Sequence, residues 1–255
     1  VLAHGLCMND LQWARQGHDH GTALARDLGY TPAYLHYNSG RHISTNGREF
    51  ADQLEILVAN WPVAVKELAI LGHSMGGLLA RSAWHYGTAA GHAWPRRLKK
   101  LVFLGTPHHG APMERGGNLI DIALGVSPYT APLSRLGKIR SAGITDLRHT
   151  WLLDEDWRGR DRFARSSGHH AAVPLPDGVK CFAIAATTGK QAGDIKDRLV
   201  GDGLVPLASA LGCHAEHDRN LMFPPDRQWI ALETGHLDLL CRKPVYERIR
   251  GWLAA

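Results

Sequence analysis

The stretch Leu68-Ala69-Ile70-Leu71-Gly72-His73-Ser74-Met75-Gly76-Gly77 decides the fold. Its first four residues form an apolar run typical of a buried strand, and the pattern G-x-S-x-G follows, with Ser74 at its centre. Gly72 and Gly76 flank the serine because side chains there would collide as a strand and a helix approach closely. With the helical spacing that follows, the stretch predicts a strand, a strained turn and a helix. A glycine-rich turn with an incidental serine is the alternative, and the flanking strand and helix patterns argue against it.

Six apolar runs mark the strands that surround this turn. They lie at roughly Val1, Ala33, Leu68, Leu101, Cys181 and Trp229. The runs are continuous rather than alternating, so both faces of the sheet should be covered. Because helical patterns separate the strands, the sequence predicts the α/β class, with a mostly parallel, doubly wound sheet and helices on both faces.

Helical spacing is clearest after residue 46. Asn46-Gly47-Arg48-Glu49 has the form of a capping box that opens a helix. One apolar stripe then follows at helical spacing, and it consists of Phe50, Leu54, Leu57, Val58 and Trp61. We expect Pro62 to close this helix.

The stretch 108–178 interrupts the alternation of strands and helices. It is too long for a plain crossover helix and carries several prolines. The sequence therefore predicts a core made of residues 1–107 and 179–255, with a cap or lid inserted at 108–178. The insertion leaves the carboxyl end of a strand, so it would lie over Ser74 and shape a pocket.

Two tryptophans of the predicted cap are candidate substrate contacts. Trp151 and Trp157 flank a short segment that could line the pocket or act as a lid. Packing of the cap onto the core is an equally good interpretation of both side chains.

An acid and a base follow the later strands. Reactive side chains gather at the carboxyl ends of strands in this architecture. His236 directly follows the last strand, and Asp202 lies in the loop region after the preceding one. The order Ser74, Asp202, His236 is the chain order of a Ser-His-Asp triad on such a sheet. His236 as a core histidine and Asp202 as a turn residue are the structural alternatives, and Asp194 and Asp197 are rival acids.

Composition narrows the class of protein. The 255 residues are 44% hydrophobic and 21% charged, as in an ordinary globular domain, and no apolar run approaches the ~20 residues of a membrane span. The net charge of +5 is scattered, and its densest cluster, Arg96 to Lys100, reads as a solvated connection between a helix and a strand. Nucleic-acid binding is therefore not expected. No group among the 16 histidines has metal-ligand spacing, so no metal is expected.

Neither the cysteines nor the N-terminus determines the cellular compartment of the protein. Cys7, Cys181, Cys213 and Cys241 are widely spaced, and the sequence leaves open whether any two form a disulfide. The sequence begins at Val1, inside a predicted strand, so a preceding signal peptide or extension stays open. The compartment is not decided, with a lean towards the cytoplasm, and the oligomeric state is left open.

Five short motifs, in this order, resemble those of α/β-hydrolases of the lipase and esterase kind. They are His4-Gly5-Leu6, Gly72 to Gly76, Gly105-Thr106-Pro107-His108, Asp202-Gly203-Leu204-Val205-Pro206 and Gly235-His236. The resemblance covers most of the chain except the middle insertion. It implies an α/β-hydrolase fold and an oxyanion hole made by the backbone N–H groups of Leu6 and Met75.

The resemblance and the residues together predict a carboxylic ester hydrolase that works through an acyl-enzyme, without a cofactor. The substrate would be a small-molecule or lipid ester. An acyltransferase, thioesterase or lipid deacylase with the same triad is the main alternative, and a non-catalytic binding protein of the same fold is another. We expect His4 to shape its turn and His73 to pack beside the serine, with substrate contact as the lesser alternative for both.

Overall fold

A parallel β-sheet forms the centre of the protein. The computed structural model describes residues 1–110, 141–160, 173–191 and 201–255. Within them the sheet consists of β1 (Leu2–Ala3), β2 (Tyr34–Leu35), β3 (Leu68–His73), β4 (Leu98–Leu104), β5 (Lys180–Ala186) and β6 (Gln228–Ala231). The six predicted strands are thereby confirmed. Their spatial order is β2-β1-β3-β4-β5-β6, with every neighbouring pair parallel. The direction of winding changes at β1 and β3, and such a switch point is where open α/β sheets place their sites.

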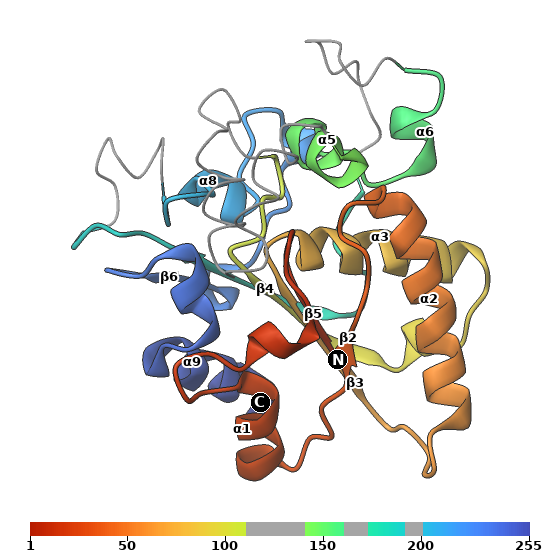
Figure 1. Cartoon of the computed structure of the whole chain (residues 1–255), viewed down its shortest axis with the longest axis horizontal. Coiled ribbons are helices and arrows are strands. Elements are labelled where there is room, and N and C mark those ends of the chain that lie inside the picture. The colour runs from red at the N-terminus through yellow and green to blue at the C-terminus, as the bar shows by residue number, and fades with distance from the viewer. Residues whose placement is uncertain (111–140, 161–172, 192–200) are drawn as a thin grey trace.

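Helices cover both faces of the sheet, as the continuous apolar strands require (Figure 1). On one face, α2 (Ile43–Asn60) and α3 (Met75–Ala89) pack against each other and against the side chains of β3 and β4. On the other face, α1 (His20–Leu28) and α9 (Lys243–Ala254) cover β3, β4 and β5. The predicted doubly wound architecture is confirmed.

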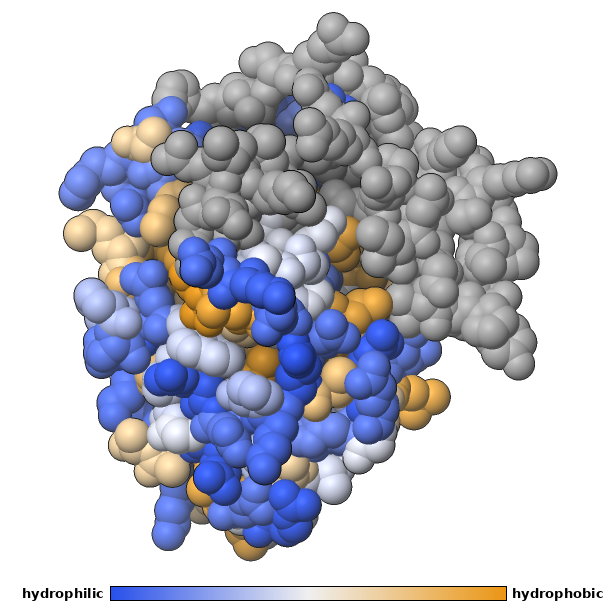
Figure 2. Space-filling model, turned by 90° about the vertical axis from the view of Figure 1, so that its left-hand side faces the viewer, coloured by the Kyte–Doolittle hydropathy of each residue, from blue (hydrophilic) through white to orange (hydrophobic). Residues whose placement is uncertain are grey.

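Short helical segments complete the described chain. The α-helical ones are α5 (Ala142–His149), α6 (Asp154–Trp157) and α8 (Leu207–Ala210). The 3-10 segments are η1 (Asp10–Trp13), η2 (Trp94–Arg96), η5 (His217–Arg219), η6 (Pro225–Arg227) and η7 (His236–Leu240). None of the described helices is long and apolar enough to cross a membrane. On the face drawn in Figure 2, hydrophilic residues surround separate groups of apolar side chains.

The N-terminus of α2 differs from the prediction. The helix begins at Ile43, before the predicted capping box, and its N-cap His42 makes no side-chain capping bond. Instead, the Ile43 N–H donates to Oδ2 of Asp146, 103 residues away on α5, at 2.7 Å. The prediction was wrong because this capping oxygen comes from a distant part of the chain. The Asn46 side chain, now inside the helix, donates to the backbone oxygen of Asn38.

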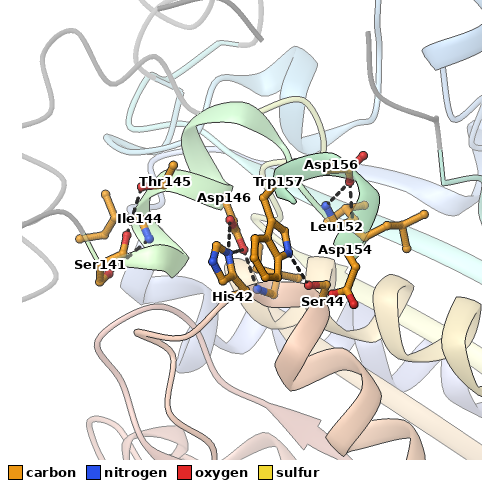
Figure 3. Close-up of polar contacts among 12 residues, drawn as sticks. His42, Ser44, Ser141, Ile144, Thr145, Asp146, Leu152, Asp154, Asp156 and Trp157 are labelled. Carbon is orange, nitrogen blue, oxygen red and sulfur yellow. Dashed lines mark hydrogen bonds and ion pairs between the residues drawn. The ribbon is translucent and has the colours of Figure 1, made fainter. Parts of the chain in front are cut away.

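The described part of the inserted stretch docks onto the first turns of α2 (Figure 3). His42 Nδ1 lies 2.9 Å from Oδ1 of Asp146, and the His42 ring stacks on Trp157 at 3.9 Å between centroids. The Trp157 Nε1–H donates to the Ser44 hydroxyl oxygen at 2.9 Å. The division into a core and a cap at 108–178 stays a prediction, because 111–140 and 161–172 lie outside the described residues.

Candidate active site

Ser74 lies on a strained turn between β3 and α3. Its φ of 53° and ψ of −123° place a non-glycine residue in a rarely occupied backbone region. Such a conformation costs on the order of 1–3 kcal/mol and persists only where surrounding contacts hold it. Two backbone hydrogen bonds hold Ser74 in this conformation. The Ser74 N–H donates to the backbone oxygen of Leu104 at 2.8 Å, and the Gly77 N–H donates to the backbone oxygen of Ser74 at 3.1 Å.

The glycines around Ser74 are required by close backbone approach. A Cβ on Gly76 would lie 2.2 Å from the backbone oxygen of Ala3. A Cβ on Gly72 would lie 2.6 Å from the backbone nitrogen of Gly77. A Cβ on Gly5 would lie 3.0 Å from Cβ of Ser74, so the turn after β1 passes directly beside the serine. Larger residues at Gly72 and Gly76 would push α3 away from the sheet and open the turn.

His236 and Asp202 form a buried hydrogen-bonded pair. His236 begins η7 after β6, and its Nδ1 lies 2.7 Å from Oδ2 of Asp202. The other carboxyl oxygen of Asp202 accepts from the N–H groups of Leu204 and Val205, at 3.0 and 2.9 Å. These contacts leave Asp202 as an acceptor towards His236. The hydrogen of the imidazole is then on Nδ1, and Nε2 keeps a free lone pair.

This pair lies against the turn that also holds Ser74. A Cβ on Gly105, which follows β4, would be 3.1 Å from both Asp202 Oδ2 and His236 Cε1. The preceding residue, Leu104, accepts the Ser74 N–H. The structure thus places the Asp202–His236 pair beside the end of β4 that holds the Ser74 turn, and among the described residues no hydrogen bond joins Ser74 Oγ to His236. The rival acids at 194 and 197 lie outside the described residues.

His73 connects the serine turn to His236. Its Nε2–H donates to the backbone oxygen of His236 at 3.1 Å, and the two rings are 4.7 Å apart between centroids. Burial, and then the nearby charge of His236, holds the pKa of His73 well below its usual value. His73 therefore stays neutral beside the proposed base in a packing position, and its contact with substrate stays a prediction.

The backbone N–H groups of Leu6 and Met75 are free to donate to a ligand oxygen. Met75 is the first residue of α3, where helix N–H groups are not paired within the helix. Within the described part of the chain, neither this N–H nor that of Leu6 has a hydrogen-bond partner. Leu6 lies in the turn after β1, which the Gly5 contact places beside Ser74. Both donors thus border the serine, and the dipole of α3 adds positive potential.

His4 supports this turn from behind. Its fully buried ring stacks on Tyr37 at 4.2 Å, and its Nδ1–H donates to the backbone oxygen of Gly5 at 2.9 Å. The Tyr37 hydroxyl donates to the backbone oxygen of His4 at 2.7 Å. Burial lowers the pKa of His4 to about 4. The structure places His4 as a support for the turn, and direct substrate contact stays a prediction.

His20 is a supporting residue that the sequence did not indicate. It begins α1, far along the chain from the site, yet its Nε2–H donates to the backbone oxygen of Leu239 in η7 at 2.9 Å. His18 donates in turn to His20 Nδ1 at 2.8 Å. These bonds anchor the segment that carries His236. The only local signal was Asp19, which caps α1 through the Thr22 N–H.

The two tryptophans lie in packing contacts. Trp151 is 3% exposed and stacks on His149 at 4.6 Å. Trp157 stacks on His42, as described above. Their proposed contact with substrate stays a prediction.

Apolar side chains adjoin both free amides. Leu78, Leu152, Leu153 and Val173 form a buried cluster with Met75, and Leu6 packs against it. This cluster joins α3 to the described part of the inserted stretch. An acyl chain bound beside Ser74 would find an apolar surface here.

In the described residues, no set of three His, Cys, Asp or Glu side chains could hold a metal ion. All four cysteines are free thiols, so no disulfide links them. The candidate reactive groups are Ser74, His236, Asp202 and the backbone N–H groups of Leu6 and Met75.

The comparisons with known proteins agree with this architecture. A Bacillus licheniformis lipase in its mature form superposes with a TM-score of 0.61 at 16% identity, covering 98% of this chain and 90% of the lipase. Aspergillus fumigatus lipase B has a TM-score of 0.55 at 12% identity over 96% of this chain and 49% of its own. Naproxen esterase from Bacillus subtilis has a TM-score of 0.51 at 14% identity, covering 99% of this chain and 81% of its own. A search of curated proteins found no match.

At such identities these superpositions show the fold, which is that of α/β-hydrolases, as predicted. The family relationship rests on the sequence itself. The model of the PGAP1-like alpha/beta domain matches residues 1–175, which is more than half of the chain and includes the Ser74 turn. The chain therefore belongs to the PGAP1-like alpha/beta domain family.

Proposed function

We propose that the protein is a serine hydrolase of carboxylic esters. The observation that carries the proposal is the 2.7 Å contact between His236 Nδ1 and Asp202 Oδ2, beside the strained Ser74 turn. A buried carboxylate that accepts from Nδ1 leaves Nε2 as the basic nitrogen. A serine is a weak nucleophile without such a base.

In the proposed first half-reaction, Ser74 Oγ attacks the ester carbonyl carbon as His236 Nε2 takes the hydroxyl proton. The carbonyl oxygen becomes an oxyanion that accepts from the N–H groups of Leu6 and Met75. Each such donor is worth on the order of 2.7–4 kcal/mol in the transition state. The intermediate then collapses, the bond to the alcohol breaks, and the alcohol leaves with the proton from His236.

In the second half-reaction, water replaces the alcohol. His236 takes a proton from the water as its oxygen attacks the acyl carbon of the Ser74 ester. Collapse of the second intermediate returns that proton to Ser74 and releases the carboxylic acid. Asp202 holds the imidazole in one tautomer and stabilises the imidazolium in both halves.

The apolar cluster beside the amides supports an ester with an apolar acyl group. Met75 belongs both to that cluster and to the proposed oxyanion hole. An acyl chain attached to Ser74 would therefore extend towards Leu78 and Leu152. The names of the superposed proteins, lipases and an esterase, are consistent with a small-molecule or lipid ester as substrate.

Hydrolysis of p-nitrophenyl esters of increasing chain length tests the proposal. The native protein should release p-nitrophenol, and Ser74→Ala should reduce the rate to that of the uncatalysed reaction. Thr88→Ala is the matched control, because it removes an exposed hydroxyl at the far end of the same helix. Equal hydrolysis by the native protein and Ser74→Ala would contradict the assignment. Product analysis with added alcohol or thiol acceptors separates hydrolysis from acyl transfer.

A further inference from the structure

A cavity lies further along α3 from Ser74. Its volume is about 240 Å³, and its lining includes Arg81 of α3, His108 of the turn after β4, and Leu175 before β5. Arg81 is seven residues beyond Ser74, which at 1.5 Å per residue is about 10 Å along the helix. Ser74, Asp202 and His236 do not line it, so the cavity is separate from the proposed catalytic group of side chains.

Arg81 is a buried cation without an acidic partner. Arg81 is 3% exposed, and no carboxylate of the described residues forms an ion pair with it. Nη1 contacts His108 Nδ1 at 3.3 Å, Nη2 donates to the backbone oxygen of Val173, and Nε has no hydrogen-bond partner among the described residues. Burial lowers the pKa of Arg81 to about 10, so it stays charged at neutral pH. An unpaired buried charge is costly, and the usual remedy is an anion.

His108 supplies a second unsatisfied donor. An arginine can only donate, so the contact with Arg81 makes His108 Nδ1 the acceptor and places the ring hydrogen on Nε2. His108 is 1% exposed, and within the part of the chain that the structure describes its Nε2 has no hydrogen-bond partner. Two buried donors without acceptors thus belong to the lining of one cavity. In native structures such groups require an explanation, and an unseen ion is one.

The remaining lining indicates the kind of anion. Apart from Arg81 and the histidines, the walls include the apolar residues Leu152, Val173, Leu175 and Leu221. A small inorganic anion would leave these walls without contact. Asp218 and Arg219 also border the cavity with opposite charges, and Arg219 pairs with Glu216 at 3.8 Å, so Arg81 is the cation left for a ligand. The lining therefore fits a monoanion with an apolar tail.

We propose that this cavity binds a short-chain carboxylate, with the carboxylate on Arg81 and His108 and the tail against the apolar walls. Its volume is below that of sites for drug-sized ligands, which are about 300–1,000 Å³, so the tail is short. Leu152 and Val173 also pack in the cluster that contains Met75. A ligand in the cavity would therefore contact side chains that pack against the proposed oxyanion hole. The binding needs neither Ser74 nor an ester.

Calorimetric titration of the native protein with hexanoate, acetate, hexan-1-ol and inorganic phosphate tests this proposal. Hexanoate should bind with one site per chain and more tightly than the other three, because only it satisfies both the cation and the walls. Equal binding of acetate or hexan-1-ol would overturn the proposal. Binding of phosphate without binding of hexanoate would also overturn it.

Three variants locate the site. Arg81→Gln removes the charge and should weaken hexanoate binding by about tenfold or more. Leu175→Trp fills the cavity from a half-buried position and keeps Arg81 in the chain, and it should abolish binding even if Arg81→Gln fails to fold. Arg41→Gln, which breaks the exposed pair with Glu49, is the control and should bind like the native protein.

The test distinguishes this cavity from the proposed acyl site. Hexanoate bound beside Ser74 would survive Leu175→Trp and would disappear when a fluorophosphonate blocks Ser74. That combination would overturn the second site. Binding that is lost in Leu175→Trp and kept after the block supports it, whether or not the protein hydrolyses esters.

Discussion

Acid should destabilise this protein because several histidines are buried in neutral form. His20 is the clearest case: it is fully buried, and burial lowers its pKa from 6.5 to about 4. In the unfolded chain the same histidine takes up a proton as the pH falls through about 6.5. The folded state does not take it up until the pH approaches 4, so stability is lost between pH 6.5 and 4.

The size of the effect follows from the two pKa values. At pH 5, a shift from 6.5 to about 4 corresponds to about 2 kcal/mol of lost stability from His20 alone. His4 and His73 act in the same direction, because burial lowers the pKa of each. Against a total stability of about 5–15 kcal/mol for a typical domain, this loss is large.

Urea unfolding at pH 7 and pH 5 measures the loss. His20→Gln retains a side-chain N–H for the backbone oxygen of Leu239 but cannot titrate. It should therefore reduce the difference in unfolding free energy between the two pH values by about 2 kcal/mol. His217→Gln changes an exposed histidine and should leave the difference unchanged. The same pH dependence in His20→Gln as in the native protein would refute the reasoning.

Three further predictions concern the turn, the insertion and the pair. Gly76→Ala should strongly destabilise the fold or abolish ester hydrolysis, since its Cβ would meet the Ala3 oxygen; circular dichroism and the ester assay report both. Asp146→Ala should cost about 1–3 kcal/mol in thermal unfolding, because the Ile43 N–H loses its buried acceptor; an unchanged Tm would contradict this. Asp202→Asn should lower kcat about 10⁴-fold while the fold persists, because the wrong imidazole tautomer is favoured; a loss below tenfold would count against the pair.

The parts of the structure that follow from local sequence were predictable. The strand, turn and helix around Ser74 are encoded within about ten residues, because an apolar run, paired glycines and helical spacing lie next to one another. The six strands were predictable for the same reason. The pairing of His236 with Asp202 was predictable because the rule that sites lie at the carboxyl ends of strands needs only strand order, while their catalytic roles stay a prediction.

Features that depend on distant contacts were not predictable. The start of α2 depends on Asp146, whose carboxylate reaches Ile43 across the fold. The support of η7 by His20 likewise joins residues 219 positions apart. The unpaired charge of Arg81 is visible only once its burial is known, because a lone arginine on a helix is usually solvated.

Identification of the residue that reacts with a fluorophosphonate tests the central claim most directly. Mass spectrometry of the treated native protein should locate one adduct on the peptide that contains Ser74. Labelling should slow greatly in His236→Gln, which lacks the base, while Thr88→Ala should label at the native rate. An adduct on another residue, or no adduct on a folded native protein, would contradict the account.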